Sequence, residues 1–132
     1  KNNSLDTLNQ IVFHVFQNLY KKGSVRDTPV NPDDINSGLI IENLKINNKP
    51  ITDITTSGTQ LIIDLATPIL PSELATIEVS WQFSIPTKSD IRMGGKDAST
   101  FFLGQWYPKI AVYDDIKGWD RNIYTGGQRI LL

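Results

Sequence analysis

The stretch ATIEVSWQFSI, residues 75–85, decides the fold class. Apolar side chains stand at every second position, and Thr, Glu, Ser and Gln lie between them: Ala75, Ile77, Val79, Trp81, Phe83 and Ile85 form the apolar set. A period of two places that set on one face of a β-strand and the polar set on the other. One buried and one solvated face is typical of an antiparallel sheet. Pro86 ends the run because proline cannot donate to the hydrogen-bond ladder.

Similar extended patterns lie on both sides of this stretch. They predict strands over residues 8–16, 39–46, 51–55 and 59–65, with an interrupted extended segment over residues 101–113. Residues 8–16 are apolar on both faces, so we expect this strand to be covered on both sides. Turn signals at Asn47-Asn48, Gly58 and Asp114–Gly118 separate the strands. The pattern predicts an all-β fold, an antiparallel β-sandwich that forms a single domain over residues 1–132.

The connecting segments are predicted from proline, glycine and polar residues. Residues 67–73 form a proline-bounded loop, and residues 88–99 form a polar, mobile loop that contains Gly94-Gly95. Residues 21–37 are rich in Asp, Asn and Pro and are predicted to form a loop with a helical turn.

Composition narrows the classes of function. The chain has 132 residues, a formal net charge of −1 and no cysteine. It therefore lacks the basic excess of a nucleic-acid or membrane-surface binder, and it has no disulfide or thiolate metal site. It opens at Lys1 without a methionine, so we expect a processed or cut product whose signal peptide has been removed. This predicts an exported, periplasmic or cell-surface protein with no transmembrane segment.

The sequence offers no set of catalytic or metal-binding residues. His14 is the only histidine, which is too few for a histidine-based zinc site or a standard triad, so we interpret it as a strand histidine with a local hydrogen bond. Asp33-Asp34 and Asp114-Asp115 lack the ligand spacing of a calcium loop and are interpreted as turn and cap residues. Gly94-Gly95-Lys96 lacks a phosphate-loop pattern and is interpreted as an ordinary loop. We expect no catalytic residue, no metal and no cofactor in this chain.

Aromatic residues crowd the second half of the chain, and two interpretations stay open. The set comprises Trp81, Phe83, Phe101, Phe102, Trp106, Tyr107, Tyr113, Trp119 and Tyr124. An aromatic platform could bind sugars or peptide side chains. Alternatively, the rings form the core and its rim. The clean apolar face that carries Trp81 and Phe83 favours the second interpretation.

The segment Gln105-Trp106-Tyr107-Pro108-Lys109-Ile110-Ala111-Val112-Tyr113-Asp114-Asp115, followed by Gly118-Trp119 and Tyr124–Gly127, carries a resemblance. It closely resembles a stretch of the M1-family (aminopeptidase N-like) zinc metallopeptidases, above all the exported group of Bacteroidetes. Residues 8–21, 39–49 and 68–73 are similar to the first strands and loops of that group. The resemblance implies a saddle-like N-terminal β domain that packs on a separate catalytic domain. The zinc would be held by that other domain, because no zinc motif occurs here.

The resemblance also implies two candidate substrate-contact residues. The family uses a Gln-x-Gln/Glu motif to hold the free amine of the substrate, and Gln105 matches its first position. Tyr107 stands at the second position. A tyrosine hydroxyl can accept a hydrogen bond but cannot form a charge pair with an ammonium group.

The last residues depart from the resemblance. After Gly126-Gly127 the family group continues into a Glu-Phe-Tyr strand, whereas this chain reads Gln128–Leu132. We therefore expect the strands that complete the saddle to be missing. A sheet edge left free in this way invites pairing with another chain, which predicts self-association through an edge strand.

Two functions follow as expectations. The first is a non-catalytic N-terminal β domain of an M1-like zinc aminopeptidase, which packs on the catalytic domain and shapes substrate access. The second is a stand-alone β-sandwich module that binds glycans or peptides. A docking domain should expose a large apolar surface. A self-sufficient binding module should instead show an aromatic groove with a polar rim.

Overall fold

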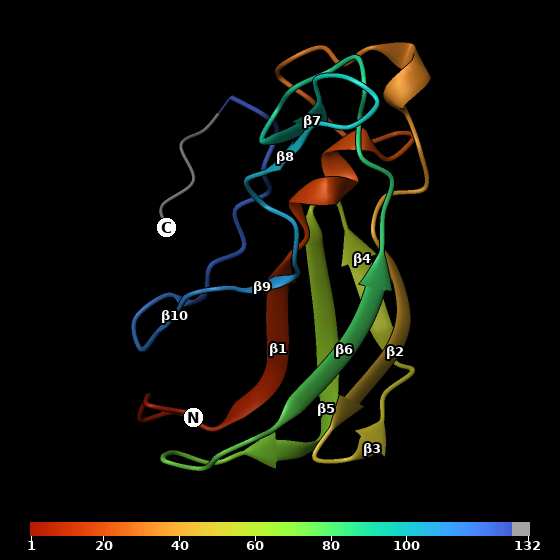
Figure 1. Cartoon of the computed structure of the whole chain (residues 1–132). Helices are drawn as coiled ribbons and strands as arrows, with labels where there is room; N and C mark the ends of the chain where they lie inside the picture. The colour runs from red at the N-terminus through yellow and green to blue at the C-terminus, as the bar shows by residue number, and fades with distance from the viewer. Residues whose placement is uncertain (128–132) are drawn as a thin grey trace.

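Two antiparallel sheets face each other across a shared apolar core (Figure 1). The larger sheet has the order β4-β5-β1-β9, built from β1 (Leu8–His14), β4 (Ile54–Ser57), β5 (Gln60–Ile69) and β9 (Lys109–Ile110). The smaller sheet has the order β3-β2-β6, built from β2 (Ile40–Ile46), β3 (Lys49–Pro50) and β6 (Ile77–Gln82). This computed structural model describes residues 1–127. The predicted all-β, antiparallel sandwich is confirmed.

The remaining elements are short. Strands β7 (Met93–Gly95) and β8 (Phe101–Leu103) form one hairpin, and β10 (Tyr113–Asp114) and β11 (Gly118–Trp119) form another. The described residues also include the 3-10 turns η1 (Phe16–Tyr20) and η2 (Pro32–Asp34). In Figure 1 the β7–β8 hairpin and both 3-10 turns lie at the upper end of the sandwich. Within residues 1–127, no helix is long and apolar enough to cross a membrane.

The main core lies between the two sheets. Its buried members come mostly from β1, β5 and β2, and they include Ile11, Phe13, Ile63 and Leu44. The prediction that residues 8–16 are covered on both faces is confirmed within β1, where four consecutive residues from Ile11 to His14 are buried. The alternation over residues 75–85 is confirmed too, but its apolar face is only half-buried.

A second buried cluster closes the upper end of the sandwich. It consists of Phe16, Leu19, Tyr20, Met93 and Tyr124. The predicted strand over residues 8–16 is too long, since β1 ends at His14 and the chain turns into η1. Asn18 fixes η1 against two other segments, because its side chain accepts from Leu39 N–H at 2.8 Å and donates to Gly58 O at 3.2 Å.

Other strand boundaries also differ from the predictions. The strand predicted over residues 51–55 begins only at Ile54 and ends at Ser57. The strand predicted over residues 59–65 continues to Ile69 and includes Pro68, which was assigned to a loop. Proline is tolerated there because β4 pairs with β5 only as far as Ile63, so beyond that residue no β4 ladder bond is lost.

The predicted turns are confirmed. Asn47 and Asn48 join β2 to β3 with positive φ values of 50° and 66°. Asparagine adopts this left-handed conformation more readily than most residues. Gly58 joins β4 to β5 with a φ of 56°, and the β10–β11 turn ends at Gly118 with a φ of 76°.

Candidate functional site

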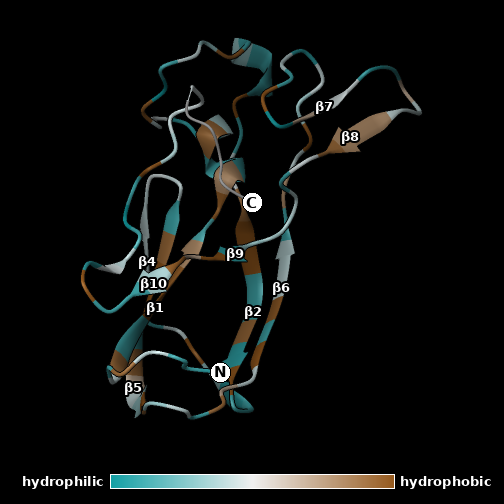
Figure 2. Ribbon diagram, turned by 90° about the vertical axis from the view of Figure 1, so that its left-hand side faces the viewer, coloured by the Kyte–Doolittle hydropathy of each residue, from teal (hydrophilic) through white to brown (hydrophobic). Residues whose placement is uncertain are grey.

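A run of exposed apolar side chains begins in β8 and continues to β9 and beyond. It comprises Phe101, Phe102, Leu103, Trp106, Tyr107, Ile110 and Val112, each 40–68% exposed. We call this set the apolar surface. Figure 2 shows the hydrophobic strand β8 projecting away from the two sheets. Single exposed apolar residues are ordinary, whereas this many large ones within one short segment make it a candidate interaction site.

Glycines in β7 allow the aromatic residues of β8 to lie across the hairpin. A Cβ on Gly94 would stand 2.8 Å from a ring carbon of Phe102, and one on Gly95 would stand 3.2 Å from a ring carbon of Phe101. Both rings therefore cover glycine backbone on the partner strand. The prediction of a mobile, ordinary loop over residues 88–99 is wrong at this point, because Met93–Gly95 form a strand.

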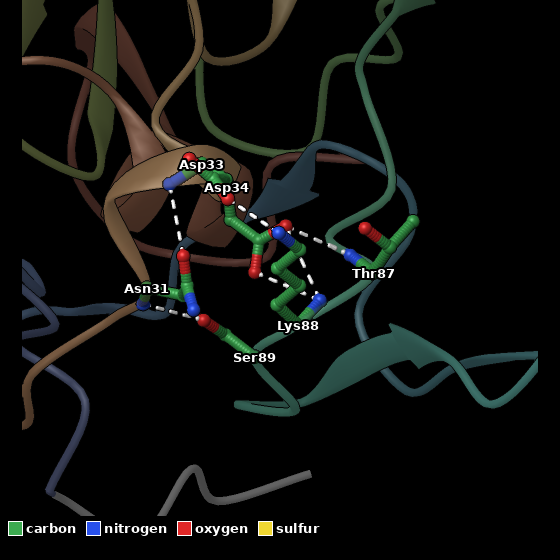
Figure 3. Close-up of polar contacts among 6 residues, drawn as sticks. All are labelled: Asn31, Asp33, Asp34, Thr87, Lys88 and Ser89. Carbon is green, nitrogen blue, oxygen red and sulfur yellow. Dashed lines mark hydrogen bonds and ion pairs between the residues drawn. The ribbon is translucent and has the colours of Figure 1, made fainter.

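A buried carboxylate fixes the chain that leads from β6 to β7 (Figure 3). Asp34 is buried, and its side chain accepts hydrogen bonds from Thr87 N–H at 2.9 Å and from Lys88 N–H at 3.1 Å. Burial by itself would raise the pKa of Asp34, but the hydrogen bonds from Thr87, Ser89 and Lys88 lower it overall. Asp34 therefore holds this loop in its charged form.

The interpretation of Asp33-Asp34 as turn and cap residues is only partly right. Both residues lie in η2, but the N-cap is Asn31, whose side chain accepts from Asp33 N–H at 3.0 Å. Asn31 N–H in turn donates to Ser89 Oγ at 2.8 Å, and Lys88 pairs with Asp33 (Figure 3). The sequence showed the turn but gave no sign that it binds a loop more than fifty residues away.

Three aromatic rings cluster where β6 meets the apolar surface. The Trp81 and Trp106 ring centroids are 5.8 Å apart, and the Trp106 and Tyr107 centroids are 5.4 Å apart in an edge-to-face arrangement. Trp81 Nε1 donates to Trp106 O at 3.1 Å. This bond ties the segment before β9 to the end of β6, so the apolar surface is held against the sandwich.

The two candidate substrate-contact residues have different surroundings. Gln105 is buried, and its carbonyl oxygen accepts from Gln17 Nε2 at 3.0 Å. Tyr107 is 42% exposed and forms part of the apolar surface. The structure thus leaves one of these side chains accessible and covers the other.

Many of the aromatic residues do not belong to the core. Tyr124 is buried, but Phe101, Phe102, Trp106 and Tyr107 are exposed. The interpretation that these rings form the core and its rim is therefore wrong for most of the segment 101–107. One signal was present in the sequence: Phe101-Phe102-Leu103 has no polar alternation, and such a run in a two-residue-period fold leaves apolar groups on both faces.

His14 lies at the upper end of β1 and lines an open cavity of about 770 Å³. Burial is the largest influence on its pKa and lowers it below 6.5, although Asp120 acts in the opposite direction. His14 Nε2 is 3.5 Å from Asp120 Oδ2, and the ring stacks on Phe16. The expected local hydrogen bond is not what the structure shows, because this contact joins residues far apart in sequence. Within residues 1–127, Nδ1 has no hydrogen-bond partner.

A second cavity, of about 470 Å³, opens between the two sheets beside β6. We call it the edge cavity, and it is lined by Leu8, Ile11, Ile69, Ile77, Tyr113 and Trp119, among others. Tyr113 donates to Asp6 Oδ2 at 2.6 Å, and this hydrogen bond is the largest cause that raises the pKa of Tyr113 to about 12. Trp119 Nε1 donates to Gln10 O at 3.0 Å.

The acidic residues do not gather into a metal site in the part of the chain that the structure describes. Across residues 1–127, no group of three or more His, Cys, Asp or Glu side chains is placed to hold a metal ion. Asp114 instead accepts from the backbone N–H groups of Ile116 and Lys117, which closes the β10–β11 turn. These hydrogen bonds lower the pKa of Asp114, so it stays charged in the turn.

Comparison with known proteins identifies no relative. The chain matches no protein family, no curated protein and no solved structure.

Proposed function

We propose that this chain is a non-catalytic β domain that docks on a separate folded domain, and that this partner is the zinc-binding catalytic domain of an M1-like aminopeptidase. One observation carries the docking proposal. The segment that resembles the M1 family contains four of the seven side chains of the apolar surface, Trp106, Tyr107, Ile110 and Val112, which are 42–68% exposed. A domain that worked alone would gain stability by covering these groups or replacing them with polar ones.

The composition of the apolar surface supports docking. Interface centres are enriched in Trp, Tyr and Phe and depleted in charged residues. From Phe101 to Val112 the only charged residue is Lys109. Trp106 and Tyr107 add rings that are already packed edge to face, so docking would cost little side-chain entropy at these residues.

The position of Tyr107 supports a role in shaping substrate access. Its hydroxyl lies on an exposed side chain, whereas Gln105 is buried beneath the same segment. In the docked state Tyr107 would face the partner domain, where its hydroxyl could accept a hydrogen bond from a bound peptide amine. Gln105 would act as a positioning residue, since its carbonyl oxygen holds Gln17 and fixes the path of the chain.

The proposal is tested first by the coding sequence that follows residue 132. An in-frame His-Glu-x-x-His motif on a helix would supply the zinc ligands that this chain lacks. The domain that carries it can then be produced separately and titrated with this chain by calorimetry. A downstream region with no such motif, or a zinc domain that shows no binding, would contradict the proposal.

Matched charge substitutions locate the docking surface. Val112→Asp places a carboxylate in the apolar surface, and we expect it to weaken binding to the zinc domain at least about tenfold. Ile116→Asp is the control, because Ile116 is 95% exposed on the β10–β11 turn and lies outside the apolar surface. Equal effects of the two substitutions would place the interface elsewhere.

A second function is favoured by the ring cluster of Trp81, Trp106 and Tyr107. Adjacent exposed rings can stack on the apolar face of a sugar or on a peptide side chain. Titration of the chain with neutral oligosaccharides and with short peptides, followed by tryptophan fluorescence, measures this directly. Saturable binding that Trp106→Ala removes, with no binding to the zinc domain, would favour this module over the docking domain.

A further inference from the structure

His14 is a buried, titratable side chain that the proposed docking surface does not use. It is 8% exposed and lies at the end of β1, where β9 covers the outer edge of that strand and pairs Lys109 with His14. Figure 1 shows β9 at the upper end of β1. The imidazole ring stacks on Phe16, with 5.5 Å between the ring centroids, and Nε2 lies 3.5 Å from Asp120 Oδ2. Segments from both halves of the chain therefore cover this one histidine.

The surroundings of this ring suit neutral imidazole better than imidazolium. Neutral imidazole carries one N–H group, whereas imidazolium carries two and has no acceptor left. Nε2 of His14 faces the carboxylate of Asp120, but Nδ1 is buried and has no hydrogen-bond partner within residues 1–127. A proton on Nδ1 would therefore lie in the interior without an acceptor. An unpaired buried donor that belongs to a charged group is costly.

The elements packed around His14 supply charges of both signs. Lys109 from β9 disfavours a second cation beside it, whereas Asp120, which follows β11, favours one. Strand β5 places Gln60 opposite His14, and η1 places Phe16 against the ring, so the residues that these two elements bring here are uncharged. Burial has a larger influence than either charge and lowers the pKa of His14 below 6.5.

Three further charged residues line the open cavity beside His14, and each has a contact of its own. The guanidinium of Arg121 donates to Gln10 Oε1. The carboxylate of Asp114 accepts from Lys117 N–H at 2.6 Å, and the ammonium of Lys117 lies close enough to this carboxylate to lower its pKa further. Their charges are thus partly satisfied away from the imidazole ring.

The segment that covers His14, residues 109–124, is held on the sandwich by few backbone hydrogen bonds. Strand β9 pairs with β1 over two residues, and Ala111 N–H donates to Val12 O at 2.8 Å. Further along, Tyr124 N–H donates to Thr59 Oγ1 at 2.8 Å. On the other side of β1, by contrast, β5 pairs with nearly the whole length of the strand. A segment with few backbone bonds opens at a lower cost in free energy than a central strand pair.

We propose that His14 is a pH-sensitive latch, whose protonation opens the segment 109–124 away from β1 while the two sheets stay folded. Opening exposes Nδ1 to water, which can accept its proton, and separates the imidazolium from Lys109. Protonation therefore shifts the population toward the open form. The proposal concerns the free chain and does not rest on docking, although Ile110 and Val112 of the apolar surface belong to the segment that opens.

The direction of the effect follows from the proton affinities of the two forms. In the open form His14 is exposed and takes up a proton near its ordinary pKa of 6.5, whereas burial lowers its pKa in the closed form. The open form therefore binds more protons below pH 6.5, and each pH unit below that value favours opening by up to about tenfold. Well above pH 6.5 both forms are neutral, so the segment stays closed.

The test follows the full chain by NMR from about pH 7.5 to about pH 5.5. His14 is the only histidine in the sequence, so its imidazole signals give its pKa without ambiguity. Amide exchange, corrected for the intrinsic rate at each pH, measures opening at Ala111 and Tyr124. The control amide is Ile51 N–H, which donates to Leu44 O in the smaller sheet. We expect protection of the two segment amides to fall at least about threefold more than that of the control.

Two substitutions should act in opposite directions. His14→Phe keeps a ring against Phe16 but cannot take up a proton, so the pH-dependent opening should disappear. Asp120→Asn removes the carboxylate that favours imidazolium in the closed form, so opening by acid should become larger.

Several outcomes would overturn the proposal. They are unchanged protection of the segment amides, an equal loss at the control amide, a loss that persists in His14→Phe, a smaller loss in Asp120→Asn, and a His14 pKa at or above 6.5 in the wild-type chain. The wild-type titration and Asp120→Asn decide the question even where His14→Phe does not fold. Neither substitution alters a residue of the apolar surface, so these outcomes do not bear on docking.

Discussion

Two regions of this protein use the same kinds of side chain in opposite ways. Ile63 in β5 is fully buried between the sheets, whereas Ile110 in β9 is 49% exposed on the apolar surface. Strand β5 has a partner strand on each side and a facing sheet, but β9 pairs over two residues of β1 only. The difference teaches that apolar composition alone does not make a core, because burial also needs partners on the neighbouring elements.

The largest expected effect comes from a substitution in the sandwich core. Ile63→Ala removes a fully buried side chain, and we expect it to lower the free energy of unfolding by about 3 kcal/mol. The matched change on the apolar surface, Ile110→Ala, should cost less than about 1 kcal/mol, because half of that side chain is already in water. Chemical denaturation of the two variants measures the difference. Equal losses would mean that the apolar surface is part of the stabilising core.

The contrast also explains which features of the fold could be predicted from the sequence. The alternation over residues 75–85 predicted the sheet face correctly, because a two-residue period leaves only one way to bury Ile77 and Val79. It could not show that this face is half-buried, since burial depends on the elements that lie around β6 and not on β6 itself. The strand end at Ile69 was missed for a similar reason, because it depends on pairing with Leu8, which is distant in sequence.

The second prediction concerns the link between the sandwich and the hairpin that carries β8. Asp34→Ala removes the acceptor for Thr87 N–H and Lys88 N–H and should lower the free energy of unfolding by about 2 kcal/mol. Amide exchange should rise first at these two residues. Asp33→Ala is the control, because its pairing with Lys88 is exposed to solvent and contributes little. If the core and the loop lose protection together, the two regions form one cooperative unit.

The third prediction uses the lowered pKa of His14. The unfolded chain takes up a proton near pH 6.5, whereas folded His14 resists protonation because it is buried. The unfolded state therefore binds more protons in this range, so stability is present above pH 6.5 and is lost as the pH falls through and below that value. Thermal denaturation from about pH 8 to about pH 5 should show this decline, and His14→Phe should remove it.

Titration of Asp34 and Asp114 does not contribute to the decline in stability expected between about pH 8 and about pH 5. Asp34 and Asp114 have pKa values lowered from 3.8, so both remain charged throughout it. Their contribution to stability is lost only at more acid pH, as the pH falls through their folded pKa values. A decline that persists in His14→Phe would show that another group controls stability between pH 5 and 8.

The candidate site was less predictable than the fold. The Gln105–Tyr107 segment drew attention through its resemblance, but the sequence did not show that Gln105 would be buried and Tyr107 exposed. Burial here depends on Gln17 in η1, which contacts the carbonyl oxygen of Gln105 from nearly ninety residues away. Exposure of Phe101 and Phe102 depends on the glycines of β7 beneath their rings. Such long-range contacts leave no periodic signal in the sequence.

The smallest effect on stability is expected on the apolar surface itself. Tyr107→Ser and Val112→Ser change side chains that are 42% and 68% exposed, so each should alter the free energy of unfolding by no more than about 0.5 kcal/mol. Both should nevertheless reduce the binding of the dye anilinonaphthalene sulfonate, which reports exposed apolar groups. Ile116→Ser is the control for a lone exposed residue. A loss of stability near that of Ile63→Ala would show that these side chains complete the core, whereas loss of dye binding alone would identify a surface kept apolar for a partner.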